Sequence, residues 1–211
     1  MSHILFIDTE TTGLDPKRHG IISLCARLFE DGKPVEGRNS DLDEHGNVGA
    51  ALVGDNQWYR FNEDFDTYQI DLSAMRVNKL ALDRDGLRYQ IQYQGRSGCK
   101  KSHPNEKLLI DERSFASSFA SFLIQINKIP DLCIGGMNVQ FDLRFIHALF
   151  EKHNLNPQGV IPTRVVDTQV IAAFLHNAGI INVPNFKSET LYKHFDIEML
   201  YQEKGLHHQN L

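Results

Sequence analysis

One short stretch near the start of the chain constrains its fold and chemistry most. Four consecutive apolar residues, Ile4–Ile7, are followed by Asp8-Thr9-Glu10. An apolar run without alternating polar residues predicts a strand buried on both faces. Asp8 and Glu10 lie two positions apart, so both carboxylates project from the same side of an extended chain. Their mutual repulsion and burial need compensation, and the first sixteen residues hold no Lys or Arg, so a divalent cation is the simplest candidate.

The alternative is that Asp8 and Glu10 only end the strand in solvent, before the turn residues Thr11-Thr12-Gly13. An isolated Asp-x-Glu is a weak motif. The whole run Asp8–Leu14, Asp-Thr-Glu-Thr-Thr-Gly-Leu, resembles the first motif of the DEDD exonucleases of the DnaQ-like type, which follows a hydrophobic first strand. That resemblance implies an α/β, RNase H-like fold with a mixed five-stranded sheet flanked by helices. It also implies two Mg²⁺ or Mn²⁺ ions and hydrolysis of DNA or RNA from the 3′ end.

The composition is that of an ordinary globular protein, with 41% hydrophobic and 23% charged residues. A length of 211 residues suits one exonuclease domain over 1–211. Three scattered cysteines favour a reducing compartment, and no stretch has the length of a membrane span, so we expect a cytoplasmic protein. The net charge of −5 disfavours broad attraction to phosphate but allows a local basic patch.

Taken in order, the rest of the chain predicts alternating strands and helices with two insertions. We expect a second strand over 21–30, a hairpin turn at 31–34, a third strand from about Val35, a helix over 114–128 capped by Ser114, and a buried strand over 132–137. The segments 71–78 and 187–197 resemble short helices of the DEDD family. The two insertions are expected to be β-rich: 38–57 has many turn residues and no clear period, and in 83–113 the alternation over 87–93 predicts a small hairpin. Basic residues in the second insertion (Arg96, Lys100, Lys101 and His103) either grip nucleic acid or are solvated loop charges.

A second candidate group opens the helix that begins near Asn138. Asn138 and Asp142 are four residues apart and can point toward one place at the helix start, where the helix dipole favours a carboxylate. A capping Asn and a first-turn Asp explain the same pattern without catalysis. The sequence Asn-x-x-Phe-Asp after a strand is similar to the second motif of the DEDD family, in which that Asp supplies a third carboxylate.

Residues 161–176 predict a strand that turns into a helix, with Asp167 as a structural cap and Arg164 as a candidate phosphate contact. Asp167-Thr168 is similar to the Asp-Thr that opens this helix in the family.

The third motif of the family, a His followed five positions later by an Asp, is incomplete. His208 fits best and His207 is the alternative; in either register the Asp falls beyond Leu211, and so does the final helix. Three explanations stay open: a truncated chain, loss of one ligand, or the family branch with Tyr-x-x-x-Asp, represented by Tyr192 and Asp196. Truncation is the most economical, since Tyr192 aligns better with the preceding helix.

The resemblance assigns the roles. Asp8, Glu10 and Asp142 bind the two ions, and His208 accepts the proton of the attacking water. The substrate-binding residues are Thr11, Thr12, Gly13, Leu14, Asn138 and Phe141, with Leu14 against the terminal base. The function expected is release of nucleoside monophosphates from a 3′ end. The alternatives are a nucleic-acid-binding protein without turnover and a polymerase-associated subunit. The choice between DNA and RNA, the strandedness and the oligomeric state stay open.

Overall fold

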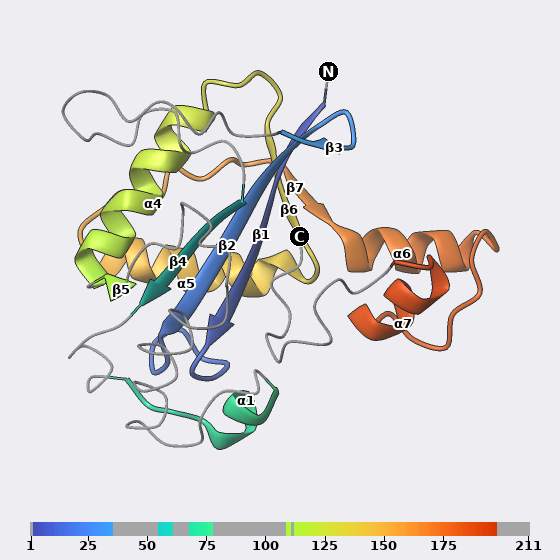
Figure 1. The fold of residues 1–211 in the computed structure, drawn as a ribbon, viewed down its shortest axis with the longest axis horizontal. Coiled ribbons are helices and arrows are strands. Elements are labelled where there is room, and N and C mark those ends of the chain that lie inside the picture. The colour runs from blue at the N-terminus through green and yellow to red at the C-terminus, as the bar shows by residue number, and fades with distance from the viewer. Residues whose placement is uncertain (1, 36–54, 61–67, 78–108, 111, 198–211) are drawn as a thin grey trace, which may run out of the picture.

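The computed structural model describes residues 2–35, 55–60, 68–77, 109–110 and 112–197. Within them, five longer strands form a sheet in the order β4-β2-β1-β6-β7 (Figure 1), namely Asp55–Arg60, Ile21–Glu30, His3–Thr11, Cys133–Gly136 and Val165–Asp167. Two strands of two residues each, β3 (Lys33–Pro34) beside β2 and β5 (Leu109–Ile110) beside β4, extend it. β1 runs antiparallel to β2 and parallel to β6. This is the mixed α/β sheet of the RNase H-like fold that the family resemblance implied.

The sequence predicted that the first strand is buried on both faces, but in the structure it is β2 that is buried on both faces, along its first six residues. In β1, Leu5 and Ile7 are buried, whereas Ile4 and Phe6 on the opposite face are half-buried. In β2, the first six residues are all buried, including Ser23 at 3% exposure. β1 therefore has a more accessible face along its length, and its acidic residues follow at the carboxyl end.

The turn after β2 follows the predicted hairpin chemistry. Asp31 and Gly32 both adopt positive φ angles, 47° and 77°, as a two-residue hairpin turn requires. The strand expected from about Val35 is the two-residue β3, and the longer partner of β2 is β4. The expectation of an irregular segment over 38–57 is wrong for 55–57, which begin β4.

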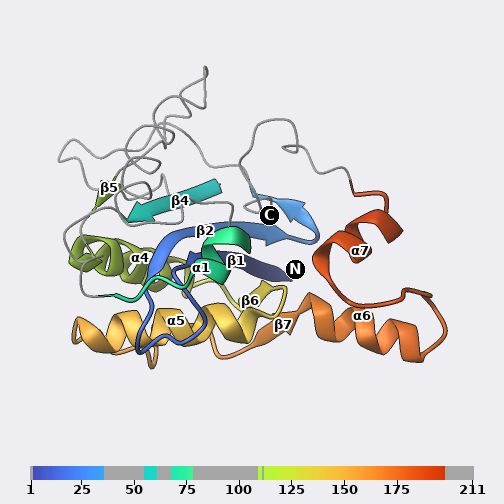
Figure 2. The same cartoon turned by 90° about the horizontal axis from the view of Figure 1, so that it is seen from below.

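Two helices, α4 (Glu112–Ile126) and α5 (Val139–Lys152), lie against one face of the sheet (Figure 2). Phenylalanines at α4 positions 115, 119 and 122 and at α5 position 150 are fully buried there. α4 begins two residues before the predicted start, so Ser114 lies in its first turn and does not cap it. The predicted helix over 114–128 is therefore confirmed, with each end two residues earlier than expected.

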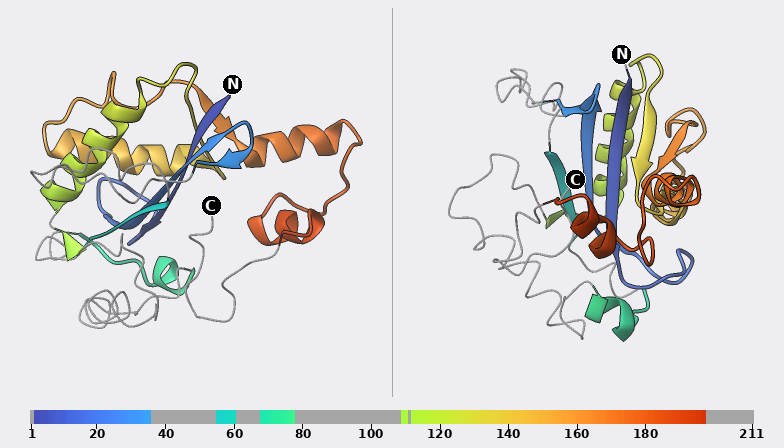
Figure 3. Two further views of the ribbon diagram at one scale, coloured as in Figure 1. Left: turned by 45° about the horizontal axis from the view of Figure 1, so that its top comes forward. Right: turned by 90° about the vertical axis from the view of Figure 1, so that its right-hand side faces the viewer.

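The remaining described helices lie outside this core. α1 (Leu72–Val77) stands near the loop after β1, whereas α6 (Thr168–Asn177) and α7 (Ser188–His194) extend past the β7 edge of the sheet (Figures 1 and 3). A small apolar cluster that includes Ala172 and Leu191 joins α6 to α7. No helix in the described part of the chain is both long and apolar enough to cross a membrane.

Several predicted features fall outside the described residues. They are most of the insertions 38–57 and 83–113, the four basic residues of the second insertion, and His207 and His208. At the end of the second insertion, Leu109–Ile110 form β5 and Glu112 begins α4.

Candidate active site

Asp8 and Glu10 lie near the carboxyl end of β1, opposite Cys25 and Ser23 of β2. Their strand positions are alternate, so both side chains leave the same face of the sheet. Both residues are half-buried, and Thr9 between them is buried. The pair therefore sits where the structure passes from core to surface.

Asp142 joins this pair from the first turn of α5. Its Oδ1 accepts two hydrogen bonds from Thr9, one from the backbone N–H at 2.9 Å and one from the hydroxyl at 2.6 Å. The side chain of Asp142 is almost fully buried, at 4% exposure of the residue. Asp142, 133 residues after Thr9, thus ties the first turn of α5 to the residue between Asp8 and Glu10.

The end of strand pairing explains why a carboxylate can reach β1 at this point. β6 pairs with β1 only from Ile4 to Phe6, after which the chain turns into α5. A Cβ at Gly136 would lie 2.8 Å from the Ile7 carbonyl oxygen, so only glycine allows this close approach. Past that point the Thr9 N–H has no β6 partner, and Asp142 supplies the acceptor that a buried N–H needs.

Burial is the largest cause of the raised pKa values of all three carboxyl groups, and neighbouring negative charges add to it. Burial, and then the Asp142 charge, raises the pKa of Asp8 to about 7. Burial and the charges of Asp8 and Asp142 raise the pKa of Glu10 to about 8. Burial raises the pKa of Asp142 to about 6, although the hydrogen bonds from Thr9 act in the opposite direction. Near neutrality the group therefore holds protons that ordinary carboxylates have lost.

The donors present fit a hard divalent cation. They are carboxylate oxygens, and in the described residues no Lys or Arg is among the groups that shift these three pKa values. Within the same residues, no three acidic, histidine or cysteine side chains already stand at the spacing of a metal site. A cation would have to draw the carboxylates closer together, displacing their protons as it binds.

Asp167 is a fourth acidic residue beside the group. As predicted, it caps α6, accepting hydrogen bonds from the backbone of Gln169 and Val170. Its Oδ1 also accepts from the backbone N–H of Asn138 at 3.2 Å, and its charge contributes to the raised pKa of Asp142. The cap therefore also holds the start of α5, a connection between two loops that the sequence did not reveal.

The predicted substrate-binding residues at the end of β1 form a closed loop. The Thr12 N–H donates to the Gly20 carbonyl at 2.9 Å, and its hydroxyl accepts from the Gly20 N–H at 3.0 Å. The Thr11 hydroxyl donates to the Gly13 carbonyl. Thr11, Thr12 and Gly13 are buried, whereas Leu14 is 67% exposed. The polar groups of Thr12 serve the loop itself, and Leu14 offers the apolar surface next to the carboxylates.

The other residues considered from the sequence, Asn138, Phe141 and Tyr192, differ in burial and in their contacts. Asn138 is exposed and adopts a left-handed conformation without a side-chain cap bond, so its backbone rather than its amide holds the helix start. Phe141 is half-buried and packs against Phe145. Tyr192 of α7, which the sequence analysis set aside, is close enough that the Asp8 charge, after burial, raises the pKa of its phenol. The hydroxyl of Ser188, the first residue of α7, donates a hydrogen bond to the sulfur of Met137, which lies in the turn between β6 and α5.

Solved structures of exonuclease I share this fold. The complex of E. coli Exonuclease I with a dT13 oligonucleotide aligns over 94% of this chain and 36% of its own, with a TM-score of 0.65 and 18% identity. The ExoI/SSB-Ct complex aligns over 98% and 39%, with a TM-score of 0.66 and 17% identity. A zinc-bound E. coli ExoI–ssDNA complex gives a TM-score of 0.64 at 19% identity over 94% and 36%.

These likenesses establish the fold and leave the activity to the site. The chain spans little more than a third of the length of those exonuclease I chains. No protein-family model matches the sequence, and no curated protein matches it significantly. The activity is therefore inferred from the arrangement of Asp8, Glu10 and Asp142.

Proposed function

We propose that the protein is a metal-dependent 3′–5′ exonuclease that releases nucleoside monophosphates from DNA or RNA. The observation that carries the proposal is the convergence of Asp8, Glu10 and Asp142. Among the described residues, the charges that shift their pKa values are those of other carboxylates, and no Lys or Arg is among them. Acidic clusters of this kind with strongly perturbed pKa values mark functional sites more often than structural ones. The likeness to structures described as exonuclease I with bound oligonucleotide supports the choice of reaction.

Asp8, Glu10 and Asp142 would hold two Mg²⁺ or Mn²⁺ ions. Bound cations would activate the attacking water and stabilise the leaving 3′ oxygen. Asp142 is suited to orient its ligand oxygen because Thr9 already fixes its other oxygen with two hydrogen bonds. His208 is proposed as the base that takes the proton of the water, since an ordinary imidazole pKa of about 6.5 suits work near neutrality.

Substrate would approach past Leu14, whose exposed side chain offers a base an apolar surface without distinguishing one base from another. Phe141, Asn138 and the loop Thr11–Gly13 complete the proposed end-binding surface. We place the whole activity in one exonuclease domain over 1–211.

The test uses a 5′-labelled single strand with Mg²⁺ or Mn²⁺, so that shortening from the 3′ end appears as a ladder. We expect Asp8→Asn to lower the rate at least about a thousandfold, because several kcal/mol of transition-state stabilisation disappear with this ligand. The matched control is Asp31→Asn, an exposed Asp in a left-handed turn that Asn adopts readily. Asp31→Asn should retain full activity.

Two outcomes contradict the proposal. Shortening that survives Asp8→Asn in the presence of cation would remove the carboxylates from the chemistry. A wild-type chain that binds the strand without shortening it under any divalent cation would instead be the nucleic-acid-binding protein without turnover.

A further inference from the structure

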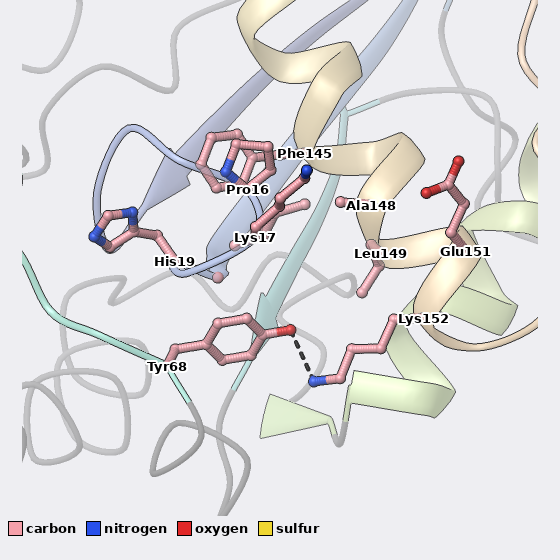
Figure 4. Close-up of a pocket in the computed structure, with 11 residues that line it drawn as sticks. Pro16, Lys17, His19, Tyr68, Phe145, Ala148, Leu149, Glu151 and Lys152 are labelled. Carbon is pink, nitrogen blue, oxygen red and sulfur yellow. Dashed lines mark hydrogen bonds between the residues drawn. The ribbon is translucent and has the colours of Figure 1, made fainter.

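A pocket of about 470 Å³, within the size range of ligand sites, lies between the loop after β1 and α5. Lys17 and His19 from the loop after β1, Tyr68, and residues of α5 that include Phe145, Leu149 and Lys152 line it (Figure 4). We propose that this pocket binds the nucleotides next to the 3′ end of a single-stranded nucleic acid. The inference deepens the proposed exonuclease function and rests on it.

The position of the pocket follows from the two elements that also carry the site. Phe145 lies three residues after Asp142 on α5, and Lys152 ten residues after it, so they stand about 4.5 Å and 15 Å farther along the helix axis. On the opposite wall, the His19 ring packs so closely on Gly13 that no Cβ would fit there. The pocket therefore adjoins the loop that carries Leu14, and a strand held at the carboxylates would extend its next nucleotides toward the pocket.

The walls combine aromatic surface with cationic charge. Tyr68 and His19 present half-buried rings, on which bases stack regardless of their identity, whereas the Phe145 ring belongs to the buried core. Lys17 and its neighbour Arg18 are exposed on the loop, and Lys17 has no ion-pair partner among the described residues. Glu151 also lines the pocket and opposes them in charge. Lys17 is thus the lining group best suited to contact a phosphate.

The Tyr68 wall is held in place before any strand arrives. The Lys152 ammonium lies 4.4 Å from the centre of the Tyr68 ring and 2.9 Å from its hydroxyl. The Tyr68 hydroxyl donates to Glu112 at 3.0 Å, and Lys152 pairs with the same carboxylate at 2.8 Å. The adjacent Gln69 is hydrogen-bonded to Arg18 through its backbone and its side chain. A ring fixed in this way loses little conformational freedom when a base stacks on it.

The experiment compares two substrates that share the same 3′-terminal nucleotides: a dinucleotide, which cannot extend into the pocket, and a strand of about eight nucleotides, long enough to cover one such site. Lys17→Glu should lower kcat/KM for the longer strand and leave the dinucleotide unchanged. For the longer strand, the slope of log(kcat/KM) against log[salt] should become shallower by about one unit in this variant, as expected for the loss of one phosphate contact. Lys33→Glu, at an exposed lysine in β3, is the matched control and should alter neither substrate.

Tyr68→Leu tests the stacking separately and should reduce kcat/KM for the longer strand by about five- to tenfold, the lower part of the range for losing one stacked base. Equal losses on both substrates, or no loss with Lys17→Glu and Tyr68→Leu, would overturn the pocket assignment. If wild type cleaves neither substrate, the exonuclease proposal fails by itself. Fluorescence anisotropy of the longer strand with Asp8→Asn, alone and combined with Lys17→Glu, then decides whether the pocket binds it.

Discussion

Among the described residues, acidic side chains are buried in two places, and their surroundings differ in charge at the two places. At the start of α4, Glu112 is fully buried, and its Oε1 accepts from the Tyr68 hydroxyl and is paired with Lys152 and His153, both at 2.8 Å. Burial by itself would lower the pKa of Lys152, but its bonds to Glu112 and Tyr68 raise it. At the end of β1, the neighbours of Asp8 and Glu10 are instead further carboxylates.

The contrast in surroundings indicates that Glu112 stabilises the fold, whereas Asp8 and Glu10 serve a function. A buried carboxylate that only stabilises the fold needs cations and hydrogen-bond donors, and the fold supplies both to Glu112. The same fold ties Asp142 to Thr9 and so brings a third negative charge to Asp8 and Glu10. An arrangement that is unfavourable for the empty protein is explained if a cation is part of the working state.

Exchanging one carboxylate for an amide should have opposite effects on stability at the two places. Glu112→Gln should lower the free energy of unfolding by about 3 kcal/mol, because it breaks a buried, hydrogen-bonded ion pair. Asp8→Asn should raise the stability of the metal-free protein at pH 8, on the order of 1–2 kcal/mol after allowance for solvent screening, because it removes repulsion. Urea unfolding with a chelator present measures both.

Glu151→Gln, at an exposed position one residue before Lys152, provides the reference for a harmless exchange. A loss of stability in Asp8→Asn comparable to that in Glu112→Gln would mean that Asp8 has a cationic partner, and the contrast between the two places would vanish.

The stability of the metal-free protein should fall as the pH rises from about 4 to about 8. The folded-state pKa values of Asp8 and Glu10, about 7 and about 8, lie above the ordinary values, so the folded protein binds more protons than the unfolded chain in this window. Below pH 4 both states are protonated and the penalty is absent. Mg²⁺ at a hundred times its dissociation constant should restore about 2.7 kcal/mol, and more Mg²⁺ should be needed at pH 6 than at pH 8.

Thermal unfolding over this pH range, with and without cation, provides the measurement. Asp8→Asn should flatten the decline and reduce the gain from Mg²⁺. A metal-free protein that becomes more stable between pH 5 and 8 would show that the raised pKa values are not a property of the folded protein.

How much the sequence predicted depends on how local each interaction is. The alternation of Asp8 and Glu10 is a local pattern, and it predicted that both carboxylates leave one face of a strand. The sheet and the convergence of Asp142 with this pair came from the resemblance to the DEDD family, because the residues around Asp142 alone are equally explained by helix capping. The Thr9–Asp142 hydrogen bonds span 133 positions, and no local pattern of the sequence signals them. Glu112 was missed for the same reason, since its partners Tyr68 and His153 lie 44 and 41 residues away and a charged residue at a helix start is usually exposed.

Removing the Asp167 side chain should have a moderate effect that reaches the carboxylates through the backbone. Asp167→Ala should cost about 0.5–2 kcal/mol of stability through loss of the α6 cap. It should also weaken cation binding by about 10–100-fold, as for other groups that hold metal ligands in place, because the Asn138 N–H at the start of α5 loses its acceptor. Calorimetric titration with Mn²⁺ measures the affinity.

Asp167→Asn keeps an acceptor oxygen and a good cap, so it should restore most of the affinity. Asp131→Ala, which removes a surface carboxylate paired with Arg164, should leave cation binding unchanged. An Asp167→Ala protein that is destabilised and yet binds Mn²⁺ normally would confine Asp167 to capping.

The smallest effect is expected at Tyr192, a described residue outside the carboxylate group whose pKa the Asp8 charge also raises. Because burial and that charge raise its pKa above the ordinary value, the phenol stays protonated near neutrality and can donate a hydrogen bond but cannot act as a base. Tyr192→Phe should therefore lower kcat by less than about tenfold and leave the pH profile unchanged, whereas loss of a general base costs about 10²–10⁴-fold. A loss of that size with an altered profile would assign the proton transfer to Tyr192, and the proposed base His208 would then be unnecessary.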